Sequence, residues 1–312
     1  MGLQAGETAA TIGFFDGVHQ GHVYLLNQLR QTAAEHGLRS MAITFDRHPR
    51  TLFHPERRTA LLTPLSDKVE LLRRYADEVH VLTFDRPMAA LTARAFMDQV
   101  LYRELHVRLL MLGYDHRFGS DQLTSFEAYQ ELGRQTGIQV FRTSEYRSDA
   151  GAVSSSSIRT LISQGQIRPA AQKLGHPYRL RGTVVGGQQI GRQLGYPTAN
   201  ILPLCPDQLI PANGVYAADI TDGDAHVHRA MLNIGNRPTI STSNHQQTIE
   251  AHLIHYDGNL YGHTLTIDFI DRLRDEQRFD SLDQLRQQLE HDCIAAEQAG
   301  TLSHHSEKSH IN

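Results

Sequence analysis

The pattern of apolar residues changes near Tyr178, and this change constrains the fold more than any other feature of the sequence. Before Tyr178, short apolar segments alternate with amphipathic ones, which is typical of strands and helices that alternate along the chain. After a first strand that ends near Ile12, the predicted strands are Met41–Phe45, Val79–Phe84, Leu109–Leu112 and Gln139–Phe141, and the predicted helices are Ser66–Tyr75, Ala93–Leu105 and Ser125–Gly137. Such alternation favours an α/β domain, a parallel sheet with helices on both faces.

After Tyr178 the predicted strands follow one another as hairpins. Val215–Ile220 and His226–Asn233 flank Asp222-Gly223, and Ile249–Tyr256 and Leu260–Phe269 flank Asp257-Gly258. An Asp-Gly pair between apolar segments is a strong hairpin signal. A small antiparallel β-barrel is the simplest way for so many short strands to avoid free edges. A last helix, from Ser281 to about Ala296, is expected to pack against this barrel.

The 312 residues suit two globular domains. We expect the first over residues 1–176, the barrel domain over residues 177–300 and a disordered polar tail over residues 301–312. Several of the 19 histidines fall in this tail, but a metal site there is not expected.

Composition excludes several classes of function. A net charge of -4 gives no broad basic surface for nucleic acid. No stretch approaches the roughly 18 apolar residues of a membrane span, and no signal peptide is evident. The two cysteines, Cys205 and Cys293, lie far apart and in no metal-ligand spacing. A cytoplasmic protein with reduced thiols is therefore expected.

The segment Gly13–His22 joins the first strand to a helical pattern and carries two histidines, His19 and His22. A helix start has unpaired N–H groups and a positive dipole end, so it suits phosphate. Two imidazoles beside it can bind phosphate oxygens and stabilise charge on a phosphoryl centre. Neither usual phosphate-loop pattern is present. Phosphate contact and a glycine turn with two surface histidines are therefore equal alternatives at this point.

Further polar segments follow later strands. Thr44–Pro49 and Gly113–Gly119 come where the second strand and a later strand end, and ligands gather beyond the carboxyl ends of parallel strands. Three such loops favour a nucleotide pocket. The serine run Val153–Arg159 leads into another helical pattern, and an N-cap is its first interpretation. Its hydroxyls and Arg159 also suit a departing pyrophosphate.

Two stretches of the second half exceed what a barrel needs. The glycine-rich segment Gly182–Arg192 suits either a cover over a nucleotide or a plain flexible loop. Thr198 and Asn200, two residues apart on an extended segment, point the same way and offer hard oxygen ligands for Mg²⁺. Glu250 lies on the strand face opposite its apolar neighbours, and taken alone it is interpreted as a solvated residue.

Together these segments resemble the prokaryotic bifunctional riboflavin kinase/FMN adenylyltransferase (FAD synthetase) family. The first half carries G-x-F-D-G-V-H-x-G-H at Gly13–His22, T-F-x-x-H-P at Thr44–Pro49, G-x-D-x-R-F-G at Gly113–Gly119 and S-S-[ST]-x-I-R at Ser154–Arg159. The second half carries P-T-A-N at Pro197–Asn200, N-I-G-x-x-P-T at Asn233–Thr239, E-x-H at Glu250–His252 and L-R-x-E-x-x-F at Leu273–Phe279. These matches keep the family order over nearly the whole chain.

The resemblance implies a Rossmann-like nucleotidyltransferase domain with a parallel sheet, followed by a riboflavin kinase type β-barrel with a C-terminal helix. It implies synthesis of FMN from riboflavin and ATP, then of FAD from FMN and a second ATP, with Mg²⁺ bound to the ATP. In the kinase half it makes Glu250 the general base and Thr198 and Asn200 the metal ligands. Other implied ligand-binding residues there are Gly182, Gly186, Gly191, Arg192, Asn233, Arg274 and Glu276.

In the adenylyltransferase half the resemblance implies that His19 and His22 contact the triphosphate. It implies that Ser155, Ser156 and Arg159 hold the pyrophosphate, and that Asp16 orients the turn. The other residues assigned to this site are Gly13, Phe15, His48, Asp115 and Arg117.

Two departures from the family pattern lie in the first half. Arg47 stands where the family often has proline, and His116 where it often has phenylalanine. They support one alternative, a riboflavin kinase with an impaired adenylyltransferase domain. A second alternative is a flavin-binding carrier without turnover, but Glu250, Thr198 and Asn200 argue against it because binding alone needs no base.

Overall fold

The computed structural model of the chain describes residues 6–53, 59–114, 116–121, 123–146, 148, 151–187, 191, 194–236 and 247–300. Its internal contacts divide the chain into two compact units, with the division between Ser155 and Ser156. The unit Met1–Ser155 is called the sheet unit, and the unit Ser156–Asn312 is called the barrel unit.

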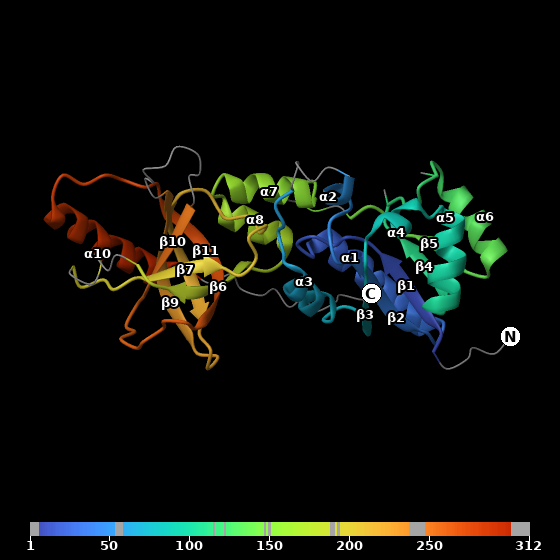
Figure 1. Cartoon of the computed structure of the whole chain (residues 1–312), viewed down its shortest axis with the longest axis horizontal. Coiled ribbons are helices and arrows are strands. Elements are labelled where there is room, and N and C mark those ends of the chain that lie inside the picture. The colour runs from blue at the N-terminus through green and yellow to red at the C-terminus, as the bar shows by residue number, and fades with distance from the viewer. Residues whose placement is uncertain are drawn as a thin grey trace. The chain divides into compact units, whose positions relative to one another are not determined.

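Five parallel strands form the sheet unit, in the order β3-β2-β1-β4-β5 (Figure 1). Their bounds are Thr8–Ile12 for β1, Arg39–Phe45 for β2, Glu78–Leu82 for β3, Val107–Leu112 for β4 and Gln139–Arg142 for β5. Every residue of β1 is buried. A central strand without an exposed residue is typical of a parallel sheet that is covered on both faces.

Helices follow the strands of this sheet in the predicted alternation. They are α1 Gln20–Glu35, α2 Pro49–Phe53, α3 Leu65–Leu72, α4 Arg86–Ala90, α5 Ala93–Ala95, the π-helix η1 Phe96–Glu104 and α6 Phe126–Thr136. The helix predicted over Ala93–Leu105 is therefore present, although most of it has the wider π form. The N–H of Leu105 donates to the carbonyl of Val100, five residues back, which is the π pattern.

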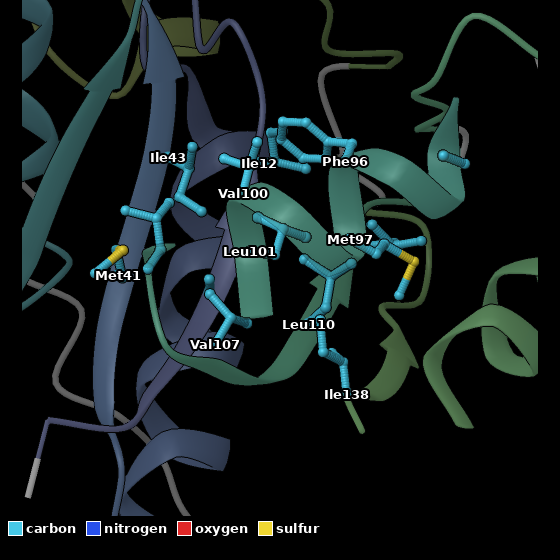
Figure 2. Packing of buried hydrophobic residues seen from close by; sticks show 14 of the residues in the cluster. Ile12, Met41, Ile43, Phe96, Met97, Val100, Leu101, Val107, Leu110 and Ile138 are labelled. Atoms are coloured by element: carbon cyan, nitrogen blue, oxygen red, sulfur yellow. The ribbon is translucent and has the colours of Figure 1, made fainter. Parts of the chain in front are cut away.

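Successive strand residues point to opposite faces of the sheet, and a hydrophobic core lies on each face. Figure 2 shows the core between the strands and η1, where Ile12, Ile43 and Leu110 meet Met97 and Leu101. The core on the opposite face lies under α1 and α3 and includes Ala9, Leu26, Leu29, Leu72 and Leu109. The alternation follows from the two-residue period of a strand.

The barrel unit contains six antiparallel strands that close in the order β10-β7-β6-β11-β8-β9. Their bounds are β6 Tyr178–Val185, β7 Ala199–Pro203, β8 Gly214–Thr221, β9 Val227–Asn236, β10 Gln247–Leu253 and β11 Thr264–Arg274. Before them come α7 Ser155–Ser163 and α8 Ile167–Leu174, and α8 packs on β6 and β11. The helix α10 Leu282–Gln298 packs on β8, β9 and β11 (Figure 1). The hydroxyl of Ser281 caps α10 by accepting the N–H of Gln284 at 3.2 Å.

One predicted hairpin is wrong. The strands on either side of Asp257-Gly258 do not pair with each other: β10 pairs with β7 and β9, and β11 pairs with β6 and β8. The other predicted hairpin, β8 with β9, is present. An Asp-Gly pair favours only a local turn. Closing the barrel places the two strands in different neighbourhoods.

The architecture confirms the predicted fold class, an α/β parallel-sheet domain followed by a small antiparallel barrel with a C-terminal helix. Among the described residues, no helix combines the length and the apolar character needed to cross a membrane.

Candidate active sites

The turn after β1 has a strained backbone. Phe15 and Val18 have φ of 54° and 39°, in the left-handed region that side-chain-bearing residues rarely adopt. Gly17 has φ of 83°, which glycine adopts without strain. At Gly13, an added Cβ atom would lie 2.9 Å from the ring of Phe15. Strain of this kind persists only where neighbouring groups hold it in place.

Asp16 is one of the groups that hold this turn. Its side chain is buried, and its carboxylate accepts the N–H groups of Leu62 and Thr63 at 3.0 and 3.1 Å. The backbone carbonyl of Asp16 accepts the hydroxyl of Ser155 at 2.9 Å. Asp16 therefore orients the turn with its side chain and links it to the start of α7 with its backbone.

His19 and His22 form one pair at the start of α1. His19 is the N-cap, and its carbonyl accepts the N–H of His22 at 2.7 Å. The two rings stack with their centres 3.6 Å apart and an angle of 16° between them. His19 is only 7 % exposed, which excludes the alternative of two surface histidines.

The ring of His22 is held in its neutral form. The pKa of His22 is held well below its ordinary value, first by burial of its ring and then by the positive charges of His19, His116 and Lys68. Its Nδ1 atom is buried and, among the described residues, has no hydrogen-bond partner. A neutral imidazole can donate one hydrogen bond and accept another, so this ring has capacity left for a ligand.

Lys68, on α3, is a functional candidate that the sequence motifs missed. Its Nζ atom donates to the carbonyls of Phe14 and Phe45, each at 3.0 Å. The same ammonium ion lies 3.9 Å from the centre of the Phe14 ring, and the ring of His48 meets Phe14 edge-on at 4.7 Å. Lys68 thus connects the turn after β1 with the loop after β2, where His48 lies.

The loop after β4 adds a third wall to this region. A cavity of about 570 Å³ opens there, lined by Tyr114, Phe126, His116, Arg117 and Arg142 among others. Two arginines and two aromatic rings suit a ligand that is both anionic and flat. Gly113, in the wall of the same cavity, lies against α1, because an added Cβ at Gly113 would lie 3.8 Å from the side chain of Leu25. The wall of this cavity therefore contacts α1, the helix that begins at the histidine pair.

Some predicted residues of this site have no structural placement beside it. Asp115 lies outside the described residues. Ser156 and Arg159 follow Ser155 in α7, but the division between the units falls inside this helix. Their roles stay predictions.

The barrel carries a row of polar residues across three neighbouring strands. Glu250 on β10 stands opposite Asn200 on β7 and opposite Asn233 on β9. The hydroxyl of Thr198 donates to Oε2 of Glu250 at 3.4 Å. Glu250 is half-buried and Asn200 is buried, so Glu250 is more than the solvated strand residue that its position alone suggests.

Two cavities meet at this polar row. One of about 360 Å³ is bounded by Glu250, Met231 and the α10 residues Leu285 and Leu289. The other, of about 540 Å³, is bounded by Val184, Pro197, Tyr256 and Tyr261 among others. Thr198 lies in the wall of both cavities. The arrangement suits two ligands whose reacting ends meet at Thr198, beside the carboxylate of Glu250.

The glycine-rich segment packs directly onto the polar row. A Cβ atom at Gly187 would lie 1.9 Å from Nδ2 of Asn200, whereas one at Gly186 would meet nothing within 4 Å. At Gly191 it would lie 2.3 Å from the carbonyl of Tyr196. Gly182 lies inside β6, and an added Cβ there would press on Ile201 at 2.4 Å. Arg192 lies outside the described residues.

Arg274 and Glu276 border the smaller cavity, but each already has a protein partner. The guanidinium of Arg274 donates to both carboxylate oxygens of Asp292 on α10, at 2.6 Å from Nη2 and 2.9 Å from Nε. Glu276 accepts the side-chain amide of Asn213 at 3.1 Å. Arg274 therefore ties α10 to the end of β11, which fixes the roof of the cavity.

His252 is a second residue whose role the motifs did not assign. Its Nδ1 donates to the carbonyl of Pro197 at 2.8 Å, and its ring meets Tyr196 edge-on. Burial lowers the pKa of His252. The histidine therefore fixes the segment that leads into Thr198, while Glu250 two residues earlier points toward the same segment.

The two sites define a class of protein. A histidine pair at a helix start on a parallel sheet, and a carboxylate beside paired oxygen ligands on a barrel, are both arrangements for phosphate chemistry. A chain with one of each is a two-site phosphate-transferring enzyme.

Comparison with known proteins gives the family. Residues 3–157 match the FAD synthetase family and residues 174–299 the riboflavin kinase family. The bifunctional riboflavin kinase/FMN adenylyltransferase of Haemophilus influenzae is 36 % identical over 92 % of this chain and 92 % of its own length. The protein of the same name from Escherichia coli K12 is also 36 % identical, over 92 % of this chain and 90 % of its own.

A solved structure is similar over most of its length. A crystal structure described as a macrolide-efflux protein from Streptococcus pneumoniae has a TM-score of 0.86 and 28 % identity, and the match covers 96 % of both chains. The chain belongs to the bifunctional riboflavin kinase/FMN adenylyltransferase family.

Proposed function

We propose that the chain phosphorylates riboflavin with ATP to give FMN at the barrel site. It then adenylylates FMN with a second ATP to give FAD and pyrophosphate at the sheet site. The observation that carries this proposal is the presence of a complete set of phosphate-handling groups in each unit. Family membership supports ATP with a divalent metal ion as the common requirement of both reactions.

At the barrel site Glu250 acts as the general base. The ribityl 5′-hydroxyl of riboflavin lies in the smaller cavity, and Glu250 takes its proton as the oxygen attacks the γ-phosphorus of ATP. Proton transfer of this kind contributes about 10²–10⁴-fold in rate. Thr198 supports the assignment because it stands 3.4 Å from Oε2 of Glu250 and lies in the wall of both cavities.

Mg²⁺ is the metal that we assign to Thr198 and Asn200. A hydroxyl and an amide oxygen are hard ligands, and they fit a cation that takes most of its ligands from phosphates and water. Such a cation neutralises charge on the transferring phosphoryl group. Gly182, Gly186, Gly191 and Arg192 belong to the segment that covers the ATP phosphates, and Gly187 in that segment contacts Asn200.

The smaller cavity is the flavin side of the barrel site. Asn233 and Glu276 lie in its wall and offer polar contacts to the substrate. Arg274 holds α10 over the cavity through Asp292, so we assign it to positioning rather than to direct contact. The larger cavity is left for ATP.

At the sheet site the phosphate of FMN attacks the α-phosphorus of ATP, and pyrophosphate leaves. No covalent protein intermediate is required, so positioning and charge stabilisation provide the catalysis. His19 and His22 contact the triphosphate, and Gly13, Phe15 and Asp16 shape their turn. Ser155, Ser156 and Arg159 hold the pyrophosphate.

FMN occupies the cavity beyond β4 in this proposal. Arg117 supplies positive charge there. Asp115 and His48 are assigned to the adenylyltransferase site without a specific role. Because Gly113 in the wall of this cavity lies against Leu25 of α1, we place FMN beside the helix that begins at the histidine pair.

Each functional module includes its flanking segments in this proposal. The adenylyltransferase module runs over residues 1–176 and so includes α7 and α8. The kinase module runs over residues 177–300. We also propose a cytoplasmic location, because both cysteines are free thiols.

Chromatography of the products tests the proposed function. The protein is incubated with riboflavin and Mg-ATP, and riboflavin, FMN and FAD are separated over time. FMN that appears first and is followed by FAD supports the proposal. FMN as the final product would instead support a kinase with an impaired adenylyltransferase domain, and unchanged riboflavin would support a carrier.

A further inference from the structure

Lys68 is unusual in the sequence and in the structure. Lysine provides only three of the 30 Lys and Arg residues, at Lys68, Lys173 and Lys308. Lys68 is 2 % exposed, although lysine is almost never fully buried. An ammonium ion is costly to remove from water unless its protons are bonded. The groups around Lys68 therefore have to compensate for its burial.

Those groups come from the ends of two neighbouring strands. Phe45 is the last residue of β2, and Phe14 follows the end of β1. The carbonyl oxygen of each accepts a hydrogen bond from Nζ of Lys68 at 3.0 Å. The ring of Phe14, centred 3.9 Å from Nζ, adds a cation–π contact. Lys68 is thus a clamp between β1 and β2, reaching them from α3.

The chemistry of this clamp favours lysine over arginine. An ammonium ion is compact and directs its three protons tetrahedrally, so it fits between two carbonyls and a ring. A guanidinium group is planar and broader, and it suits paired carboxylate or phosphate oxygens. Arginine provides nearly all the positively charged side chains of the sequence, but the buried position is occupied by lysine, Lys68.

The clamp lies directly beside the strained turn. Phe14 precedes Phe15, whose φ is 54°, and the Phe14 carbonyl also accepts the hydroxyl of Thr44 at 3.1 Å. We propose that Lys68 is a positioning residue for adenylyl transfer: its ammonium ion fixes the strained turn that presents His19 and His22. This inference rests on the proposed function of the sheet site.

The charge state of Lys68 agrees with this role. Burial lowers the pKa of Lys68 to about 8, against the carboxylates of Asp16 and Asp46, which raise it. The group is therefore mainly protonated at neutral pH, and its charge also helps to keep the neighbouring His22 neutral. Binding of a triphosphate near His22 brings negative charge close to the ammonium ion, so it should raise this pKa.

The substitution Lys68→Met removes the charge and keeps an unbranched side chain of similar length. We expect kcat/KM for FAD formation from FMN to fall at least about 100-fold, because small displacements of positioned groups have effects of that size. The reaction from riboflavin to FMN, at the other site of the same protein, should stay within twofold. Lys173→Met is the matched control and should change neither reaction.

Two kinetic outcomes would overturn the inference. One is FAD formation by Lys68→Met within threefold of the parent, and the other is an equal fall of both reactions. His22→Ala, measured in parallel, distinguishes failure of the proposed sheet site from failure of the role proposed for Lys68. If it leaves FAD formation intact, the proposed sheet site itself fails, whereas intact activity of Lys68→Met alone refutes only the role of Lys68.

A measurement on the unsubstituted enzyme does not depend on how the variant folds. With ¹³C-labelled lysine, the protein gives only three lysine side-chain signals. The signal that is lost in Lys68→Met belongs to Lys68, and the signal that is lost in Lys173→Met is excluded from that assignment. Its midpoint should lie near pH 8, well below the ordinary value of about 10.4. ATP should raise the midpoint by more than about half a unit. An ordinary midpoint, or one that ATP does not move, would contradict the proposal.

Discussion

The protonation of His22 decides what the histidine pair can do for a phosphate. Burial, His19, His116 and Lys68 all lower its pKa. As the pH falls below about 6.5, an unfolded chain binds a proton at this residue before the folded protein does. The stability contributed by neutral His22 is therefore present above that pH and is lost progressively below it, down to the lowered folded pKa.

We accordingly predict that His22 stays neutral where ordinary histidines become charged. In protein labelled with ¹³C at the histidine ring, the His22 signal, identified by its loss in His22→Gln, should keep its neutral position as the pH falls through about 6.5, the ordinary midpoint of histidine. A short unstructured peptide that contains histidine provides the comparison, and its signal should shift around pH 6.5. A His22 midpoint near its ordinary value would show that the ring is not enclosed as described.

At the scale of single residues, the motifs predict which side chains carry chemistry but not which ones hold them. The histidine pair and the Thr198–Glu250 contact fall on predicted positions. The motifs do not predict the roles of Lys68, Asp292 and His252, because the partners of these residues lie 18 to 55 positions away in the sequence. The scarcity of lysine, which occurs at three positions of the sequence, is a signal that could have pointed to Lys68.

Among the structural elements, the glycine-rich segment gives a sharp test of the barrel site. Gly187→Ala places a Cβ atom 1.9 Å from Nδ2 of Asn200, so either the segment or the side chain of Asn200 must move. We expect kcat for FMN formation to fall at least about tenfold and the KM for Mg-ATP to rise, as for a displaced positioning group. FAD formation from added FMN should be unchanged.

Gly223→Ala, in the turn between β8 and β9, is the control, because an added Cβ there has no neighbour within 4 Å. It should leave FMN formation within twofold. Equal effects of the two substitutions would mean that loss of backbone freedom, rather than the contact with Asn200, is responsible.

The helix α10 depends on its link to the barrel. Asp292→Asn leaves the guanidinium of Arg274 in a largely buried position without its charge partner, since the two side chains are 4 % and 16 % exposed. Removing one partner of a buried pair destabilises by about 3–5 kcal/mol. We therefore expect earlier release of α10 in hydrogen exchange and a raised KM for riboflavin.

Asp283→Asn, in the exposed first turn of the same helix, serves as the control. It should leave both the exchange of α10 and the KM for riboflavin nearly unchanged. If Asp292→Asn behaves in the same way as this control, the pair does not hold the roof of the cavity.

The periodicity of the sequence predicts elements better than their pairing. It places the strands and the longer helices of the sheet unit within a few residues, because each has its own apolar face, but it does not predict the short helices α2 and α4. It fails at Asp257-Gly258, where the local turn signal is followed by strands that pair elsewhere. The closure of the barrel decides those partners, and no local pattern records it.

At the scale of the whole molecule, the two departures from the family pattern leave both sites intact. Arg47 is more than half exposed and pairs with Asp46, so it does not enter the turn. His116 borders the cavity beyond β4, and its positive charge lowers the pKa of His22. Neither residue disrupts the histidine pair, which favours the bifunctional account over the kinase-only alternative.

The central claim is that one chain carries two separate active sites, the second of which uses the product of the first. Product analysis of Glu250→Ala and His22→Ala, each supplied with Mg-ATP and either riboflavin or FMN, tests it most directly. Glu250→Ala should make no FMN from riboflavin yet convert added FMN to FAD at nearly the parent rate. His22→Ala should accumulate FMN and form no FAD. Parallel losses of both reactions in either variant would contradict two separate sites.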